Sequence, residues 1–122
     1  MQLNTIQLVG NLTRDPELRY TPTGKAVAKI SLAANETYTT AEGEKKQDTV
    51  FVEAEIWGKS AENLAKLVDK GQELLVQGSL RQDKWQDKET GESRSKYFIR
   101  ADSWQFTQHA PKRQEQTVGA ER

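Results

Sequence analysis

Residues 49–57 read TVFVEAEIW and alternate between compact aliphatic side chains and larger or charged ones. Alternation over this length predicts a half-buried β-strand, because successive side chains of a strand point to opposite faces. The aliphatic residues share one face: Val50, Val52, Ala54 and Ile56. A shift of one residue would turn that whole face to water. We therefore predict that Phe51 and Trp57 stand on the outer face of the sheet.

Four other segments show the same alternation. The predicted strands cover about 5–12, 25–35, 73–85 and 94–106. The segment 73–85 carries Leu74, Val76, Gly78 and Leu80 on its inner face. Its outer face carries Trp85 together with Arg81. In the last segment the apolar parity changes between Ile99 and Trp104, which predicts a bulge or bend.

One helix and several polar segments separate the strands. The predicted turns and loops are 15–16, 21–24, 39–48 and 87–92. Ser60 is placed to cap the first turn of a helix, and Gly71 is placed to end it. The apolar stripe of this helix consists of Ala61, Leu64, Ala65 and Val68.

The order of elements is three strands, one helix and two strands. This order predicts an all-β protein with the OB-fold, a five-stranded Greek-key barrel with a helix between its third and fourth strands. Separate α and β layers are a weaker alternative, because one helix cannot cover a five-stranded sheet. Length and turn content place this domain at residues 1–107, followed by a short disordered polar tail at 108–122.

Composition limits the environment and the chemistry of the chain. It has 122 residues, 34% of them hydrophobic, and no cysteine. Its first residues lack the charged and apolar regions of a leader peptide, and no apolar run is long enough for a membrane helix. We therefore expect a soluble, cytoplasmic protein that needs no metal or cofactor.

The net charge argues against a nucleic-acid partner. Lys and Arg number 18, as do Asp and Glu, and residues 1–107 carry 15 basic and 16 acidic side chains. Nucleic-acid-binding domains usually carry a clear excess of basic residues. Only a local basic surface could bind phosphates.

Exposed aromatic side chains supply the argument for nucleic-acid binding. Phe51, Trp57 and Trp85 all fall on outer faces, where nucleobases can stack on them with about 1–3 kcal/mol per base. The cations expected beside them are Lys25, Lys29, Arg81, Lys84, Lys88, Arg94 and Lys96. Taken singly, each of these cations is also explained as part of a solvated face. Their interleaving with the tryptophans favours the binding role.

No catalytic arrangement is visible. The single histidine, His109, lies in the predicted tail, and there is no phosphate-binding glycine loop. Glu53 and Glu55 could be read as a carboxylate pair for acid–base catalysis, but they are better explained as solvated residues of a strand. The chain is therefore predicted to be a binding protein and not an enzyme.

Several motifs resemble the bacterial single-stranded-DNA-binding proteins. They run in order and at the family's spacing from residue 1 to about 107. The segments are Leu8-Val9-Gly10-Asn11-Leu12, Asp15-Pro16-Glu17-Leu18-Arg19-Tyr20, Gly24 with Ala26-Val27-Ala28, Trp57-Gly58-Lys59 with Ala61-Glu62, Lys70-Gly71, and Gly78-Ser79-Leu80-Arg81 with Trp85. The resemblance implies a sequence-independent binder of single strands, usually a homotetramer, that protects DNA in replication, repair and recombination.

The resemblance also implies particular site residues. The stacking positions of the family fall on Tyr38, Phe51, Trp57 and Trp85, and its phosphate contacts fall on Arg19, Lys59, Lys70, Arg81 and Lys84. Glu53 and Asp83 depart from the family pattern and bring carboxylates near phosphates, so the affinity is expected to be lower. The chain ends in Val118-Gly119-Ala120-Glu121-Arg122, without the acidic-hydrophobic tip that recruits partner proteins in the family.

Two other functions remain open at this point. In one, the OB-fold is a protein-interaction or assembly module with weak or no DNA binding, which the near-zero charge favours. In the other, the domain binds RNA, because stacking hardly distinguishes the two sugars.

Overall fold

The predicted strands are present, and several are longer than predicted. The computed structural model describes residues 1–107; the predicted tail and its ending lie outside the described residues. The elements are β1 (Ile6–Leu12), β2 (Glu17–Tyr20), β3 (Ala26–Thr39), β4 (Lys45–Trp57), α1 (Lys59–Leu67), β5 (Glu73–Gln86) and β6 (Ser93–Phe106).

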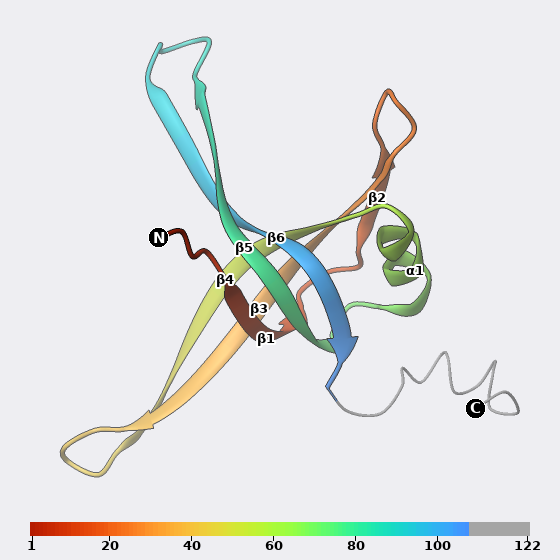
Figure 1. The fold of residues 1–122 in the computed structure, drawn as a ribbon. Coiled ribbons are helices and arrows are strands. Elements are labelled where there is room, and N and C mark those ends of the chain that lie inside the picture. The colour runs from red at the N-terminus through yellow and green to blue at the C-terminus, as the bar shows by residue number, and fades with distance from the viewer. Residues whose placement is uncertain (108–122) are drawn as a thin grey trace, which may run out of the picture.

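Five strands close into a barrel in the order β1-β5-β6-β4-β3 (Figure 1). β1 and β3 complete the ring through two residue pairs, Asn11 with Ala33 and Leu12 with Leu32. β4 and β6 meet in a short parallel pairing over Ala54–Ile56. Helix α1 connects β4 to β5, so the prediction of an OB-fold barrel is confirmed.

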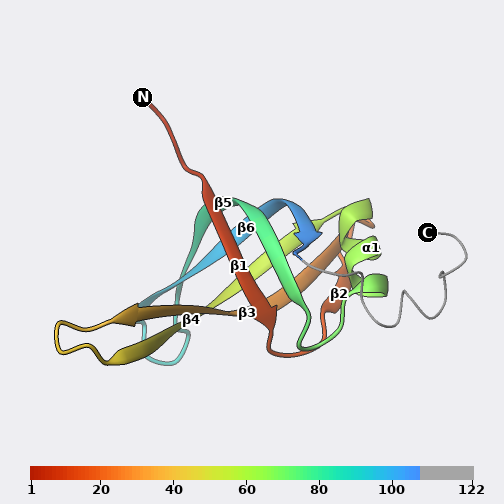
Figure 2. The same ribbon diagram turned by 90° about the horizontal axis from the view of Figure 1, so that it is seen from below.

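The barrel is filled by aliphatic side chains from its inner faces. Ile30, Leu32, Ile56, Leu74, Val76 and Ile99 are fully buried. Helix α1 covers one end of the barrel, where Ala61 and Leu64 are buried with Val68 just beyond the helix (Figure 2). Each buried Ile, Leu or Val side chain stabilises the fold by about 1.5–3 kcal/mol relative to an exposed one.

The predicted irregularity in the last strand is a β-bulge. Gln77 pairs with Ser103 and Gly78 pairs with Ala101, so Asp102 is the extra residue on β6. A Cβ atom at Gly78 would lie 2.0 Å from the carbonyl oxygen of Arg100. Glycine is therefore required where the two strands approach so closely.

One strand was missed by the sequence analysis. Residues 17–20, between the two predicted turns, form β2, which pairs with Ala26–Lys29 of β3. A four-residue strand is too short to show a periodicity. It forms because the turn at 21–24 returns the chain antiparallel along β3.

Two hairpins extend beyond the barrel, which corrects the predicted loop and part of the predicted core. The loop predicted at 39–48 is confined to residues 40–44, because β3 and β4 continue pairing from Thr39 and Lys45 (Figure 1). Val50 and Leu80 were predicted to face the core, but they are 55% and 43% exposed. Their strands have passed the rim of the barrel at these positions, so the inner side of the hairpin meets water.

The helix ends also differ from the prediction. Ser60 does not cap α1: the N-cap is Gly58, and the Ser60 hydroxyl accepts a hydrogen bond from Trp104 Nε1 at 2.9 Å. Gly71 does adopt a positive φ of 90°, but in a turn after the helix, where its N–H donates to Leu12. Among residues 1–107 no helix has the length and apolar character needed to cross a membrane.

Candidate nucleic-acid interface

The outer face of β4 carries the aromatic residues that the alternation placed there. Phe51 is 73% exposed and Trp57 is half-buried, whereas Ala54 and Ile56 on the opposite face are buried. Phe51 and Trp57 are six positions apart along the strand, a distance of about 20 Å. The two rings therefore mark a track along β4 and do not form one cluster.

Trp57 is held by contacts that the sequence did not reveal. The guanidinium of Arg100, on β6, lies 4.8 Å from the centre of the indole ring, a cation–π contact. The indole Nε1 donates to Glu55 Oε1 at 3.4 Å. The parallel pairing of β4 with β6 brings Arg100 next to Glu55, so only the closed barrel creates this arrangement.

A pocket of about 290 Å³ lies against Trp57; we call it the Trp57 pocket. It is lined by Arg19, Tyr20 and Thr21 from β2 and the turn after it, Val27 and Lys29 from β3, and Glu55 and Trp57 from β4. The Tyr20 hydroxyl donates to Glu62 of α1 at 2.9 Å, and this hydrogen bond raises the pKa of Tyr20 above its usual value. Tyr20 was not among the predicted site residues. The sequence analysis did not recognise β2, so it could not place Tyr20 beside Trp57.

A second pocket, of about 340 Å³, lies beside Phe51; we call it the Phe51 pocket. Tyr97 of β6 lines it and is 60% exposed, although the sequence analysis did not single it out. Glu53, on the same strand as Phe51, forms ion pairs with Lys96 and with Arg14 (3.7 Å). The hydrogen bond from Lys96 is the main reason that the pKa of Glu53 is lowered, despite partial desolvation.

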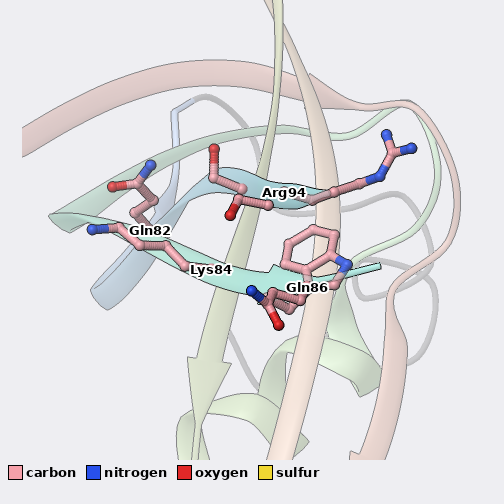
Figure 3. A pocket seen from close by; sticks show the side chains of 7 residues that line it. Gln82, Lys84, Gln86 and Arg94 are labelled. Carbon is pink, nitrogen blue, oxygen red and sulfur yellow. The ribbon is translucent and has the colours of Figure 1, made fainter. Parts of the chain in front are cut away.

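Trp85 lies on the hairpin that β5 and β6 form beyond the barrel. It is 48% exposed and pairs across the strands with Arg94. The surrounding Trp85 pocket measures about 470 Å³ and also includes Lys84 and Ser95. In Figure 3 the long side chains of Lys84 and Arg94 reach in opposite directions from the pocket. Each strand of this hairpin therefore contributes one cation to the Trp85 pocket.

The turn of the same hairpin fixes Arg94. Its guanidinium donates to Asp87 at 3.2 Å and lies 3.8 Å from Glu92. Backbone N–H groups of Glu89 and Thr90 lower the pKa of Asp87, with a smaller contribution from Arg94. Lys88 lies in this turn and is exposed.

Tyr38 lies on the other hairpin, close to its tip. It is 46% exposed and pairs with Lys46 across β3 and β4. A shallow pocket beside it is lined by Thr37, Thr39 and Lys45. Tyr38 and Trp85 therefore lie on two different hairpins, and both are distant from Trp57 in the sequence.

The predicted cations divide into three groups. Arg19 and Lys29 line the Trp57 pocket, and Lys84 and Arg94 line the Trp85 pocket. Lys96 is paired with Glu53, and Arg81 donates to Ser79 Oγ at 3.2 Å. The others are exposed and lie at element ends or in a turn: Lys25 before β3, Lys59 at the start of α1, Lys70 before β5 and Lys88 between β5 and β6. Arg19 itself donates to Glu17 at 3.0 Å.

Within residues 1–107, no group of three or more His, Cys, Asp or Glu side chains is placed to hold a metal ion. The open pockets carry aromatic rings, cations and, in two of them, a carboxylate, which are groups that bind and orient a ligand.

Comparison with known proteins decides the family. The model of the "Single-strand binding protein family" matches residues 3–107. The chain belongs to the single-strand binding protein family. The match covers every strand of the barrel, so the resemblance inferred from the motifs is confirmed.

Relatives within the single-strand binding family share about two fifths of their residues with this chain. The "Single-stranded DNA-binding protein" of Wolinella succinogenes is 40% identical over 103 residues, which is 84% of this chain and 63% of the relative. "Single-stranded DNA-binding protein A" of Bacillus subtilis is 41% identical over 104 residues, 85% of this chain and 59% of the relative. The chain thus spans less than two thirds of the length of these curated relatives.

Solved structures of the same family have the same fold. The structure described as "Plasmodium falciparum SSB complex with ssDNA" matches with a TM-score of 0.79 at 26% identity, over 88% of this chain and 97% of that one. A deletion mutant of the single-stranded DNA binding protein from Thermus aquaticus matches with a TM-score of 0.76 at 31% identity, over 87% of this chain and 51% of that one.

Proposed function

We propose that this chain binds single-stranded DNA with little regard to sequence and protects it during replication, repair and recombination. The supporting observation is the placement of Phe51, Trp57 and Trp85 outside the core, each beside a pocket. Bases present a π-face whatever their identity, so stacking on these rings is tolerant of sequence. Family membership supports the same activity.

The proposed contacts are the positions predicted from the sequence, of which Arg19, Lys29, Lys84 and Arg94 line pockets. Stacking is assigned to Tyr38, Phe51, Trp57 and Trp85, and phosphate contacts are assigned to Arg19, Lys25, Lys29, Lys59, Lys70, Arg81, Lys84, Lys88, Arg94 and Lys96. A strand that runs along β4 would meet Phe51 and Trp57 in turn, with Lys29 of the neighbouring strand beside it. Tyr97 joins this path because it lines the Phe51 pocket.

Several copies of the chain are proposed to share the DNA. Val9 is 44% exposed on the outer face of β1, where it is available to pack against another copy. A homotetramer is expected from the family resemblance, with a dimer as the simpler arrangement. Sites joined in one assembly raise the effective concentration of each for a long strand.

Titration of the tryptophan fluorescence with oligo-dT at two salt concentrations tests the function. We expect strong quenching at low salt and weaker binding at high salt, because phosphate contacts release counterions. An unchanged signal at low salt would refute DNA binding and favour the protein-interaction module. A parallel titration with oligo-U separates DNA preference from RNA binding.

A further inference from the structure

The Trp57 pocket contains a carboxylate where a pure phosphate site would contain only cations. Glu55 lines the pocket together with Lys29 and Trp57. Among residues 1–107, the Glu55 carboxylate makes one long hydrogen bond, from Trp57 Nε1 at 3.4 Å, and no ion pair. Its remaining acceptor capacity is therefore available to a ligand.

The walls of this pocket suit a flat aromatic ligand. Trp57 and Tyr20 supply two aromatic side chains, and the buried Val27 lies opposite Trp57 in the strand pairing. Arg100 rests on the indole ring, and the hydrogen bond to Glu62 holds Tyr20 against α1. A volume of about 290 Å³ is at the small end of ligand pockets, which is the range expected for a single base.

Glu55 and Lys29 present an acceptor and a donor side by side. They are directly opposite each other in the β3–β4 pairing, so their Cβ atoms lie about 5 Å apart on one face of the sheet. Lys29 is exposed and forms no ion pair within the described part of the chain. Glu55 repels a phosphate placed inside the pocket, so the space between Glu55 and Lys29 fits a base edge better than a phosphate. The Lys29 ammonium has three N–H donors and can contact a base edge in the pocket as well as the phosphate assigned to it above.

We infer that the Trp57 pocket prefers guanine, with Glu55 reading the base edge. Guanine presents two neighbouring donors, N1–H and the N2 amino group, beside the O6 acceptor. An ionised carboxylate only accepts, so its two oxygens match the two donors while the Lys29 ammonium donates to O6. Thymine offers a single N–H between two carbonyl oxygens, which leaves one carboxylate oxygen facing a carbonyl. Glu55 thus acts as a specificity-determining residue.

This inference rests on the proposed DNA binding, and its test separates the two. Three labelled oligonucleotides of equal length are compared by fluorescence anisotropy: oligo-dT, the same strand with isolated dG at every fourth position, and the same strand with inosine at those positions. Inosine keeps O6 and N1–H but lacks the N2 amino group. We expect the dG strand to bind at least about fivefold more tightly than the other two, the lower end for a bidentate base contact.

Two substitutions in β4 test whether Glu55 causes the preference for guanine. In Glu55→Gln the amide NH₂ faces the guanine donors, so the dG strand should lose its advantage. Glu53→Gln removes the same charge from the same face of the same strand, but it lies in the Phe51 pocket. It should change the affinity for all three strands by the same factor.

The possible results are distinct. Failure of all three strands to bind the unmodified protein would refute the proposed function. Equal binding of the three strands, or a dG advantage that survives in Glu55→Gln, would overturn the inference and leave DNA binding intact. Circular dichroism of both variants verifies that each is folded as the parent chain is.

Discussion

Lys96 of β6 donates from its ammonium group to the carboxylate of Glu53 on β4, so a predicted phosphate-binding cation is already neutralised within the chain. Arg14 pairs with the same carboxylate at 3.7 Å. Because both pairs are partly exposed, they contribute little to stability, but they place a negative charge beside Phe51. DNA that passes this point must compete with Glu53 for Lys96.

Glu53→Lys is expected to tighten binding to oligo-dT, most clearly at low salt. The substitution frees Lys96 and adds a cation, and each newly contacted phosphate steepens the slope of log K against log[salt] by about 0.7. Asp102→Lys, which makes the same charge change at the exposed bulge of β6, is the control for net charge alone. An affinity for Glu53→Lys no higher than that of the control would show that Glu53 lies off the DNA path.

Acid should weaken the fold through Glu53. Its pKa is lowered from an ordinary value of 4.5, so its stabilising effect is complete above that value and is lost as the pH falls through the lower, folded-state pKa. The loss should be below about 1 kcal/mol, because the carboxylate is partly exposed. Urea unfolding at pH 6 and pH 3 checks this. Glu53→Gln should lose less stability over this interval than the parent chain, and an equal loss would contradict the assignment.

Trp57→Ala and Trp85→Ala should each weaken oligo-dT binding by about 1–3 kcal/mol, because each removes one stacking surface. Trp104→Phe is the matched control: Trp104 donates to Ser60 and packs edge-on against Phe106, away from the pockets described above. That control should lose about 1 kcal/mol of stability and retain binding. Isothermal calorimetry and urea unfolding separate the two effects. Loss of binding in Trp104→Phe alone would contradict the proposed path.

Gly78→Ala should destabilise the barrel strongly. The new Cβ would lie 2.0 Å from the Arg100 carbonyl oxygen and 2.8 Å from the Ala101 Cα, both backbone atoms that cannot move without opening the bulge. We expect a loss of about 3 kcal/mol or more in the free energy of unfolding. Gly91→Ala has open space around the Cβ and a positive φ of 74°, so it should cost only about 1–2 kcal/mol. Chemical denaturation of both variants measures the difference; similar losses would mean that strain at the bulge is not the cause.

Light scattering at micromolar concentration should give about four times the chain mass of 13.8 kDa. Val9→Asp on the outer face of β1 should lower this mass if β1 contributes to the contact, because a charge there opposes apolar packing. A parent chain that scatters as one copy of 13.8 kDa would refute the assembly.

Much of the barrel could be predicted from residue alternation alone. The buried positions of Ala54 and Ile56, the outward position of Phe51 and Trp57, and the bulge between Ile99 and Trp104 all follow from the period of two. The length of the hairpins could not be predicted. Residues 45–48 are polar throughout, and they form strand only because residues 36–39 pair with them.

Predictions from local sequence were wrong where the tertiary structure changed the surroundings of a residue. Ser60 has the side chain of a helix cap, but its hydroxyl accepts from Trp104, 44 positions away. Val50 has the side chain and the parity of a core residue, but β4 has left the barrel at that point. Parity tells which face of a strand a residue occupies and not whether anything covers that face.

The sequence by itself determined the fold class, the faces of the strands and the aromatic residues left outside, because a strand's pleat depends only on its own residues. Tertiary structure alone decided the surroundings of those aromatics. Arg100 on Trp57, Lys96 on Glu53, and Tyr20 in the Trp57 pocket come from strands that are distant in the chain. Closing the barrel makes these strands neighbours. The alternation within one strand does not predict which charged or aromatic residue a neighbouring strand places beside it.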